Sequence, residues 1–247
     1  MPYLCAGDPT PHLTPKILRA LEAGGADLIE LGVPFSDPIA DGPTIQRASE
    51  RALSHRISLQ QILEMVGDLR QHTDIPIALM SYYNPIFRMG EETFCKAAHA
   101  AGVDGVIVPD LPPEQAETLL KVAPTYDLAT IFLVAPTSPP ERMQRITAVS
   151  TGFVYCVSVT GVTGARRMVS AEIAPMITEL RKHTEKPIAV GFGVSTPEQA
   201  TQIAALADGV IVGSAIVNVI EAHADDETAL LAAVQQFASD LAAGVRG

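Results

Sequence analysis

The stretch IELGVPFSDPIADGP, residues 29–43, begins as an apolar run and continues into prolines and glycines. This change of composition predicts a buried strand that ends in a loop. The stretch also holds three carboxylates, Glu30, Asp37 and Asp41. Glu30 lies inside the apolar part, where burial of an unpaired charge raises its pKa or demands a partner. A carboxylate there has either a functional role or a structural partner, and we favour the functional role.

Similar apolar runs recur along the whole chain, and each is followed by an amphipathic stretch. The predicted strands are Tyr3–Cys5, Leu28–Leu31, Ile77–Ser81, Gly105–Val108, Thr130–Val134, Phe153–Val157, Ile188–Gly191 and Gly209–Val212. The predicted helices cover residues 14–25, 44–54, 58–72, 91–102, 113–126, 139–150, 171–183, 196–207 and 226–244. Apolar residues in the strands are consecutive, as expected for parallel strands covered on both faces.

The order and number of these units favour one architecture. Eight strand–helix units in 247 residues match the size of a (β/α)8 TIM barrel. The competitor is an open doubly wound sheet, but the AGDPTP that follows the first strand lacks the G-x-G-x-x-G fingerprint of dinucleotide binding. No linker-like segment divides the chain, so we predict an α/β fold with a single barrel domain over residues 1–247.

Composition excludes several classes of function. The chain has 17 Lys and Arg against 28 Asp and Glu, a net charge of −11 that disfavours binding to nucleic acid or anionic membranes. Cys5, Cys95 and Cys156 have no paired spacing, and the first residues do not resemble a signal peptide, so we expect reduced thiols and a cytoplasmic location. The six histidines show no metal-ligand spacing, and no metal site is predicted.

The barrel hypothesis sorts the acidic residues, because TIM barrels place their active sites at the carboxyl ends of the strands. Glu30 lies at that end of the second strand, whereas Asp27 and Asp104 precede their strands and are predicted to be structural. Asp41 either takes part in the site or caps the following helix. Asp37 precedes a proline and is either a turn residue or part of an interface.

Glycine-rich junctions after the seventh and eighth strands predict a phosphate site. VGFGVSTPEQ (190–199) and VGSAIVNVI (212–220) each run from an apolar strand into glycine and then serine. Backbone N–H groups at such a junction approach phosphate oxygens closely, which makes Gly193, Gly213 and Ser214 the candidates. A further loop, SVTGVTGARR (158–167), follows the sixth strand and is either a flap over the mouth or an ordinary surface loop.

Several of these motifs together resemble one family, the tryptophan synthase alpha chains. They are LIELGVPFSDPIADGPTIQRAS (28–49), MSYYNPIF (80–87), residues 102–114, YCVSVTGVTGAR (155–166), VGFGVS (190–195) and VGSAIV (212–217). The resemblance covers nearly the whole chain. It implies retro-aldol cleavage of indole-3-glycerol phosphate to indole and glyceraldehyde 3-phosphate, a lyase reaction of tryptophan biosynthesis.

The resemblance also implies roles for individual residues. Glu30 matches the catalytic acid and base, and Asp41 matches the carboxylate that contacts the indole N–H. Asp37 matches a position at the interface with the partner chain. The positions that match substrate contacts are Tyr155, Tyr82, Asn84, Phe192 and Thr163, and those that match the phosphate site are Gly164, Gly193, Gly213 and Ser214.

The resemblance implies a beta-chain partner in an α2β2 assembly, with pyridoxal phosphate in the beta chain and no cofactor in this chain. Two alternatives stay open, a free-standing lyase that releases indole and a largely non-catalytic activator of the beta chain. Another phosphate-binding barrel enzyme, such as an isomerase or an indole-glycerol-phosphate synthase, is disfavoured. The latter is expected to use a lysine at a strand end, and the lysines here all map to helices or to loops before strands.

Two departures from the family pattern carry expectations. Val159 stands where some relatives have arginine, so any charge contact from that position is absent. The usual N-terminal helix that caps the barrel bottom is apparently lacking, because the sequence opens almost directly at the first predicted strand. We expect lower stability for the chain as given. Adding such a helix should raise the melting temperature, and an unchanged melting temperature would contradict the expectation.

Overall fold

The computed structural model describes residues 1–157, 168–191 and 193–246, and its strands form two parallel sheets. One sheet has the order β1-β2-β3-β4-β5 and the other the order β6-β7-β8-β9. The strands are β1 (Tyr3–Cys5), β2 (Ile29–Gly32), β3 (Ile77–Met80), β4 (Gly105–Ile107), β5 (Ala129–Ile131), β6 (Leu133–Val134), β7 (Val154–Val157), β8 (Ile188–Gly191) and β9 (Gly209–Ile211). Each overlaps a predicted strand.

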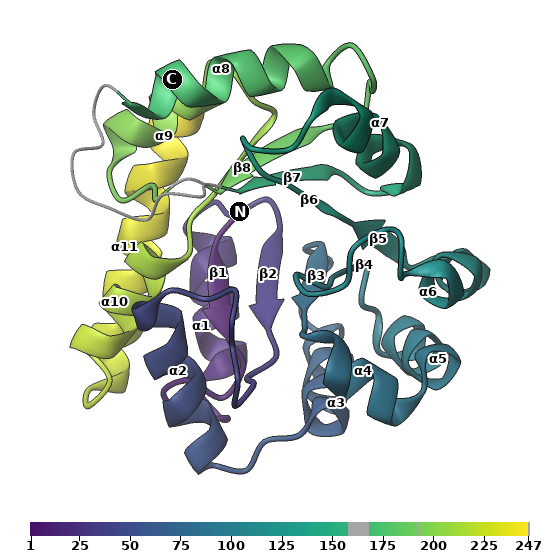
Figure 1. Ribbon diagram of the computed structural model, residues 1–247. Coiled ribbons are helices and arrows are strands. Elements are labelled where there is room, and N and C mark those ends of the chain that lie inside the picture. Colours follow the sequence, from purple (N-terminus) through teal and green to yellow (C-terminus); the bar gives the residue numbers. More distant parts are fainter. Residues whose placement is uncertain (158–167, 192, 247) are drawn as a thin grey trace.

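The two sheets join at both edges and close into a barrel (Figure 1). β5 and β6 form one strand that is interrupted at Phe132. Its first half, β5, pairs with β4, and its second half, β6, pairs with β7. At the other edge, Tyr3 donates to the carbonyl of Val212 at 2.9 Å, and Val212 donates to the carbonyl of Met1 at 3.0 Å. The described strands therefore form the predicted (β/α)8 barrel, in which no edge is left unpaired.

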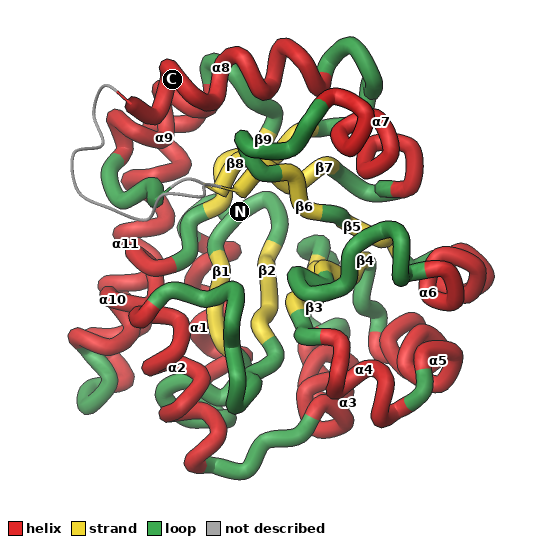
Figure 2. The backbone as a smooth tube through the Cα atoms, viewed as in Figure 1, coloured by secondary structure: helices red, strands yellow, loops and turns green. Residues whose placement is uncertain are grey.

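The helices surround the strands on the outside (Figure 2). They are α1 (Thr14–Ala23), α2 (Pro43–Ser54), α3 (Leu59–Leu69), α4 (Tyr83–Met89), α5 (Glu91–Ala101), α6 (Glu117–Val122), the 3-10 helix η1 (Ala123–Tyr126), α7 (Pro140–Val149), α8 (Met168–Leu180), α9 (Pro197–Ala204), α10 (Ser214–Ala222) and α11 (Glu227–Arg246). Among the described residues, none of these helices has the length and apolar character needed to cross a membrane.

Two helices lie outside the predicted helical stretches. α4 directly follows β3 and has Pro85 in its first turn, where a proline is also typical of a loop. α10 directly follows β9, and its mainly apolar sequence does not separate helix from strand. Both begin at the carboxyl ends of the strands, so both add structure around the barrel mouth.

Local sequence explains how several predicted helices begin. α3 starts at Ser58, whose hydroxyl accepts a hydrogen bond from the Gln61 backbone while the Gln61 side chain accepts from the Ser58 backbone. α9 starts with the same reciprocal capping box, formed by Thr196 and Gln199. Pro197 occupies the first turn of α9, where the missing N–H is harmless.

Strand register assigns each side chain to one face of the sheet. Ile29 and Leu31 belong to the apolar layer between the barrel and its helices. Glu30 alternates with them and pairs in register with Ala78, which belongs to the cluster inside the barrel. Parallel partners in register point to the same face, so Glu30 points into the barrel.

Glycines in the strands make room for aromatic rings inside the barrel. A Cβ on Gly32 would lie 2.2 Å from the Tyr3 hydroxyl oxygen, and one on Gly191 would lie 2.9 Å from the hydroxyl oxygen of Tyr155. A larger residue at either position would have to displace the neighbouring tyrosine ring. Tyr3 and Tyr155 can therefore lie across the interior, near the mouth.

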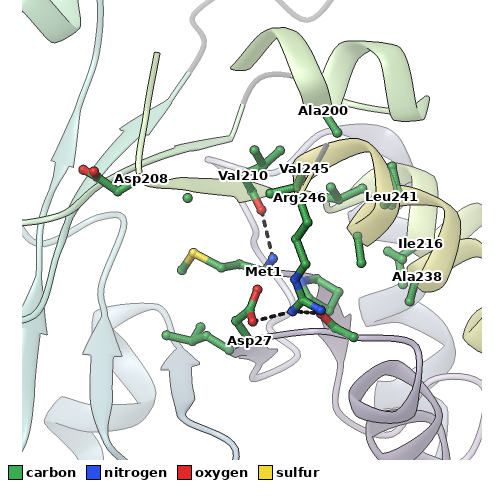
Figure 3. A pocket seen from close by; sticks show the side chains of 16 residues that line it. Met1, Asp27, Ala200, Asp208, Val210, Ile216, Ala238, Leu241, Val245 and Arg246 are labelled. Atoms are coloured by element: carbon green, nitrogen blue, oxygen red, sulfur yellow. Dashed lines mark hydrogen bonds and ion pairs between the residues drawn. The ribbon is translucent and has the colours of Figure 1, made fainter. Parts of the chain in front are cut away.

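A pocket of about 250 Å³ opens at the other end of the barrel (Figure 3). Its wall includes Met1 and Val210 from the closing strands and Leu241 from α11. Arg246 pairs with Asp27 at 2.7 Å on its rim. The pocket lies at the amino-terminal ends of β1, β2 and β9.

Replacing Gly32 with alanine should destabilise the fold by about 1–3 kcal/mol, because the new Cβ displaces the buried Tyr3 ring. Gly67→Ala is the matched control. Gly67 lies inside α3, and the nearest atom to its added Cβ is 4.0 Å away, so this change should stabilise the chain by about 0.5–1 kcal/mol. Urea unfolding measures both. Equal stability of Gly32→Ala and the unmodified chain would contradict the steric argument.

Candidate active site

Glu30 is the deepest acidic group at the barrel mouth. Its side chain is 2% exposed, and Oε2 is the one fully buried side-chain oxygen or nitrogen without a hydrogen-bond partner among the described residues. Burial raises the pKa of Glu30 to about 8. Hydrogen bonding with the Tyr155 hydroxyl and the charge of the Met1 ammonium lower this pKa, and the charge of Asp41 raises it. Glu30 is therefore mainly protonated at neutral pH, with one oxygen free for a ligand.

Asp41 lies in the loop between β2 and α2 and is partly buried. Burial raises its pKa to about 6, and hydrogen bonding with the Tyr82 hydroxyl opposes the increase. Asp41 is not the helix cap, because the N-cap of α2 is Gly42 and makes no side-chain cap bond. The capping alternative is thereby removed.

Tyr82 holds the loop that carries Asp41. It follows β3, is 4% exposed, and accepts a hydrogen bond at 2.9 Å from the backbone N–H of Ala40. The ring of Phe35, at the start of the same loop, stacks on the Tyr82 ring with centroids 5.0 Å apart. Both contacts attach the loop after β2 to the end of β3, which keeps Asp41 near the mouth.

The two carboxylates can therefore perform different tasks. Glu30 titrates near pH 8 and Asp41 near pH 6, because Glu30 is more deeply buried. At neutral pH the site holds a carboxylic acid that can donate a proton and a carboxylate that can stabilise positive charge. Such a pair suits acid–base chemistry on a substrate that develops a cation.

The junctions after β8 and β9 have the features of an anion site. Gly213 is the N-cap of α10 and has no side-chain cap, and Ser214 is exposed at the first helical position. The first amides of α10 thus lack a side-chain acceptor, and the helix dipole adds positive potential there. Gly193 has a φ of +63°, and no atom of the described residues lies within 4 Å of an added Cβ. The described residues therefore leave space beside Gly193.

Other predicted site residues occupy different surroundings. Asn84 and Asp37 are exposed, Asn84 in the first turn of α4 and Asp37 in the loop after β2. Within the described part of the chain, no hydrogen bond joins Asn84 to Glu30 or Asp41. Phe192, Thr163, Gly164 and the whole segment 158–167 lie outside the described residues.

Asp27 and Asp104 lie at the opposite end of the barrel, as predicted. Asp104 accepts a hydrogen bond at 2.7 Å from the Ile77 backbone N–H at the start of β3, and it pairs with Arg70. Asp27 pairs with Arg246 of α11. Both are structural contacts between a strand start and a helix.

Sequence reasoning missed Tyr3 as part of the site. Tyr3 pairs in register with Glu30, and the charges of Asp41 and Glu30 both add to burial in raising its pKa. The available signal was an aromatic residue within the first short strand. In the part of the chain that the structure describes, no three His, Cys, Asp or Glu side chains are placed to hold a metal ion.

Comparison with known proteins identifies the relatives of this chain. A family model described as "Tryptophan synthase alpha chain" matches residues 1–246. The tryptophan synthase alpha chain of Geotalea uraniireducens is 50% identical over 244 residues, which cover 99% of this chain and 91% of the relative.

Solved structures give the same result at the level of the fold. Tryptophan synthase subunit alpha from Legionella pneumophila matches with a TM-score of 0.91 and 40% identity, covering 99% of this chain and 91% of that one. A structure of the tryptophan synthase α2β2 complex from Pyrococcus furiosus matches with a TM-score of 0.89 and 41% identity, covering 97% and 96%.

Glu30→Gln should change how stability depends on pH. The folded chain holds the Glu30 proton up to about pH 8, whereas an unfolded glutamate releases it near pH 4.5. The unmodified chain therefore loses stability as the pH rises through this window, and a neutral glutamine does not contribute to that loss. The free energy of unfolding of Glu30→Gln, relative to the unmodified chain, should rise by a few kcal/mol between pH 5 and about pH 8.5.

Urea unfolding at three pH values measures this difference. Asp68→Asn is the control, because Asp68 is an exposed residue of α3 and its replacement likewise exchanges a carboxyl group for an amide. Asp68→Asn should follow the unmodified chain at every pH. Parallel curves for Glu30→Gln and the unmodified chain would show that Glu30 is not held protonated by the fold.

Proposed function

Because this chain belongs to the tryptophan synthase alpha-chain family, we propose that Glu30 and Asp41 carry out that family's reaction. The reaction is the lyase cleavage of indole-3-glycerol phosphate to indole and glyceraldehyde 3-phosphate. One observation carries the assignment. Glu30 has a fully buried oxygen that finds no hydrogen-bond partner among the described residues, and a second carboxylate of lower pKa reaches the same mouth.

The proposed mechanism begins with protonated Glu30, which donates its proton to C3 of the indole ring. Positive charge then develops at the indole nitrogen, where ionised Asp41 stabilises it. Glu30, now a carboxylate, accepts the proton of the hydroxyl on the carbon attached to C3. The bond between these two carbons breaks, its electrons return to the ring, and the aldehyde of glyceraldehyde 3-phosphate forms. Glu30 ends protonated, as it began.

Burial supports this exchange of roles. A donor to carbon and an acceptor from a hydroxyl must have a pKa near the working pH, and burial raises that of Glu30 to about 8. Tyr155 contributes a hydroxyl that hydrogen-bonds with Glu30, so it orients the acid. Tyr82 does the same for Asp41 through the loop after β2.

For the phosphate group, we propose the start of α10 and the junction after β8. Gly213 and Ser214 offer backbone N–H groups and a hydroxyl, and Gly193 leaves open space. Gly164 belongs to the same proposal through its match to the family. Asn84, Phe192 and Thr163 are proposed substrate contacts on the same basis.

We propose a beta chain as the partner, in an α2β2 assembly like the one from Pyrococcus furiosus. Two large apolar side chains support an interface at the barrel mouth, because Ile39 is 86% and Phe87 65% exposed. Ile39 lies in the loop after β2, close in sequence to the candidate interface residue Asp37, and Phe87 lies in α4. Indole would pass to the beta chain, which holds pyridoxal phosphate, and this chain would need no cofactor of its own. The free, buried cysteines support a cytoplasmic location.

Indole release with and without a beta chain tests the proposal. Glu30→Gln should lower kcat by about 10²–10⁴-fold, because it removes the proton donor. Asp41→Asn should lower kcat by about 10²–10³-fold, because it removes the stabilising charge. The exposed Asp68→Asn serves as the control and should match the unmodified chain.

Each outcome of this assay distinguishes between the possible functions of the chain. Full activity in both Glu30→Gln and Asp41→Asn would overturn the assignment of the carboxylates. Strong indole release without a beta chain would favour a free-standing lyase. Stimulation of the beta chain without indole release would favour a non-catalytic activator.

A further inference from the structure

A second buried acid, Asp8, lies outside the proposed chemistry. It follows β1, and its side chain is fully buried. Its two carboxylate oxygens accept hydrogen bonds from Arg51 of α2, at 2.6 Å from Nε and 2.9 Å from Nη2. A buried carboxylate is costly unless it is paired in good geometry, and this bidentate fork is the strongest pairing that a side chain offers.

The same guanidinium reaches a third segment of the chain. Nη1 of Arg51 donates to Glu221 at 2.8 Å, and Glu221 lies in the last turn of α10. Arg51 thus joins the loop after β1, helix α2 and helix α10. Figure 1 shows α2 and α10 side by side, with β1 next to both.

These three segments frame the proposed active site. α2 begins two residues after Asp41, and Gln46 in its first turn donates to the Asp41 carbonyl at 2.9 Å. α10 begins at Ser214, in the proposed phosphate site. A shift of α2 along β1 would therefore move Asp41 directly, whereas Glu30 is held by the strand ladder on both sides.

Apolar packing of α2 relies mainly on small groups. Its fully buried residues are Ala48, Ser49 and Ala52, and Ile45 packs partly buried against the same cluster. The loop after β1 approaches closely because Gly7 has no side chain, and an added Cβ there would lie 3.2 Å from the Ala52 Cβ. Contacts between small apolar groups are not directional, so they allow α2 to slide along its neighbours. The two hydrogen bonds from Arg51 to Asp8 are directional and oppose such a shift.

We propose that Arg51 is a positioning residue, which fixes α2 against the loop after β1 and α10 and thereby sets the place of Asp41 relative to Glu30 and the bound phosphate. This inference rests on the proposed function. It predicts an effect on turnover more than on substrate binding, because the phosphate contacts come from strand ends and helix starts that Arg51 does not touch. Arg51 itself does not contact the substrate.

The first experiment compares two arginines of the same helix in steady-state indole formation, with the beta chain present. Arg51→Met should lower kcat by about 10- to 100-fold and change KM by less than about threefold, since a misplaced group loses rate rather than affinity. Arg47→Met is the control. Arg47 lies one turn earlier and binds the same Glu221, but it does not reach Asp8. Its replacement should leave kcat within about twofold.

Arg51→Met also leaves the Asp8 charge buried without a partner, so a second variant separates folding from positioning. Asp8→Asn combined with Arg51→Met removes that charge as well. Its melting temperature should return toward that of the unmodified chain. Its kcat should stay at least about tenfold below that of the unmodified chain, because the contact that fixes α2 against the loop after β1 is still missing. Unchanged kcat in Arg51→Met, or full recovery of kcat together with stability in the double variant, would overturn the proposal.

Glu30→Gln, assayed alongside, separates this inference from the proposed function. Loss of activity in Glu30→Gln with full kcat in Arg51→Met would defeat the positioning role alone. Full activity in Glu30→Gln would defeat the assignment of Glu30, and the positioning role with it.

Discussion

Closure of the parallel sheet is the constraint on which the rest of this structure depends. The hydrogen bonds from Tyr3 to Val212 and from Val212 to Met1 join the first strand to the last, and the strand formed by β5 and β6 joins the two halves. In a closed barrel every residue of a strand points either inward or toward the helices. Glu30 is thereby committed to the interior, and all carboxyl ends of the strands meet at one mouth. The candidate site follows from closure before any specific contact is made.

The two acids of the site, Glu30 and Asp41, differ in how deeply they are buried in that mouth. Glu30 belongs to a strand and is surrounded by the interior row that includes Tyr3 and Tyr155, whereas Asp41 reaches the same region from a loop. Burial acts on both pKa values in the same direction but more strongly on Glu30. One neutral acid and one ionised acid can therefore stand together near neutral pH. Two ionised carboxylates in the same space would repel each other and would have to be hydrated.

Local patterns predicted what depends on neighbours in sequence. Consecutive apolar residues located the strands, including the one with Glu30, and the chain order of strands and helices predicted the barrel. The contacts made across the barrel mouth were not predictable in this way. Tyr82 meets Ala40 from 42 residues away and Arg51 meets Asp8 from 43 residues away, and no periodicity relates such positions. α4 and α10 were missed because a proline near a helix start and a mainly apolar run directly after a strand are both ambiguous signals.

Asp8 and Glu30 are the two fully buried acids among the described residues, and the barrel mouth accommodates their carboxyl groups in different ways. Both carboxyl groups are removed from water, and for both the pKa is raised by burial. Asp8 receives a guanidinium fork that occupies both of its oxygens. An acid paired in this way helps to fix three segments in place. Glu30 keeps a buried oxygen without a partner among the described residues and a proton that can leave.

A missing hydrogen bond to a buried oxygen such as Oε2 of Glu30 destabilises the chain without substrate. A substrate that supplies the missing partner recovers that free energy on binding. Asp8, which is paired with Arg51, therefore has a structural role at the barrel mouth. Glu30, whose Oε2 has no partner among the described residues, has the chemical role.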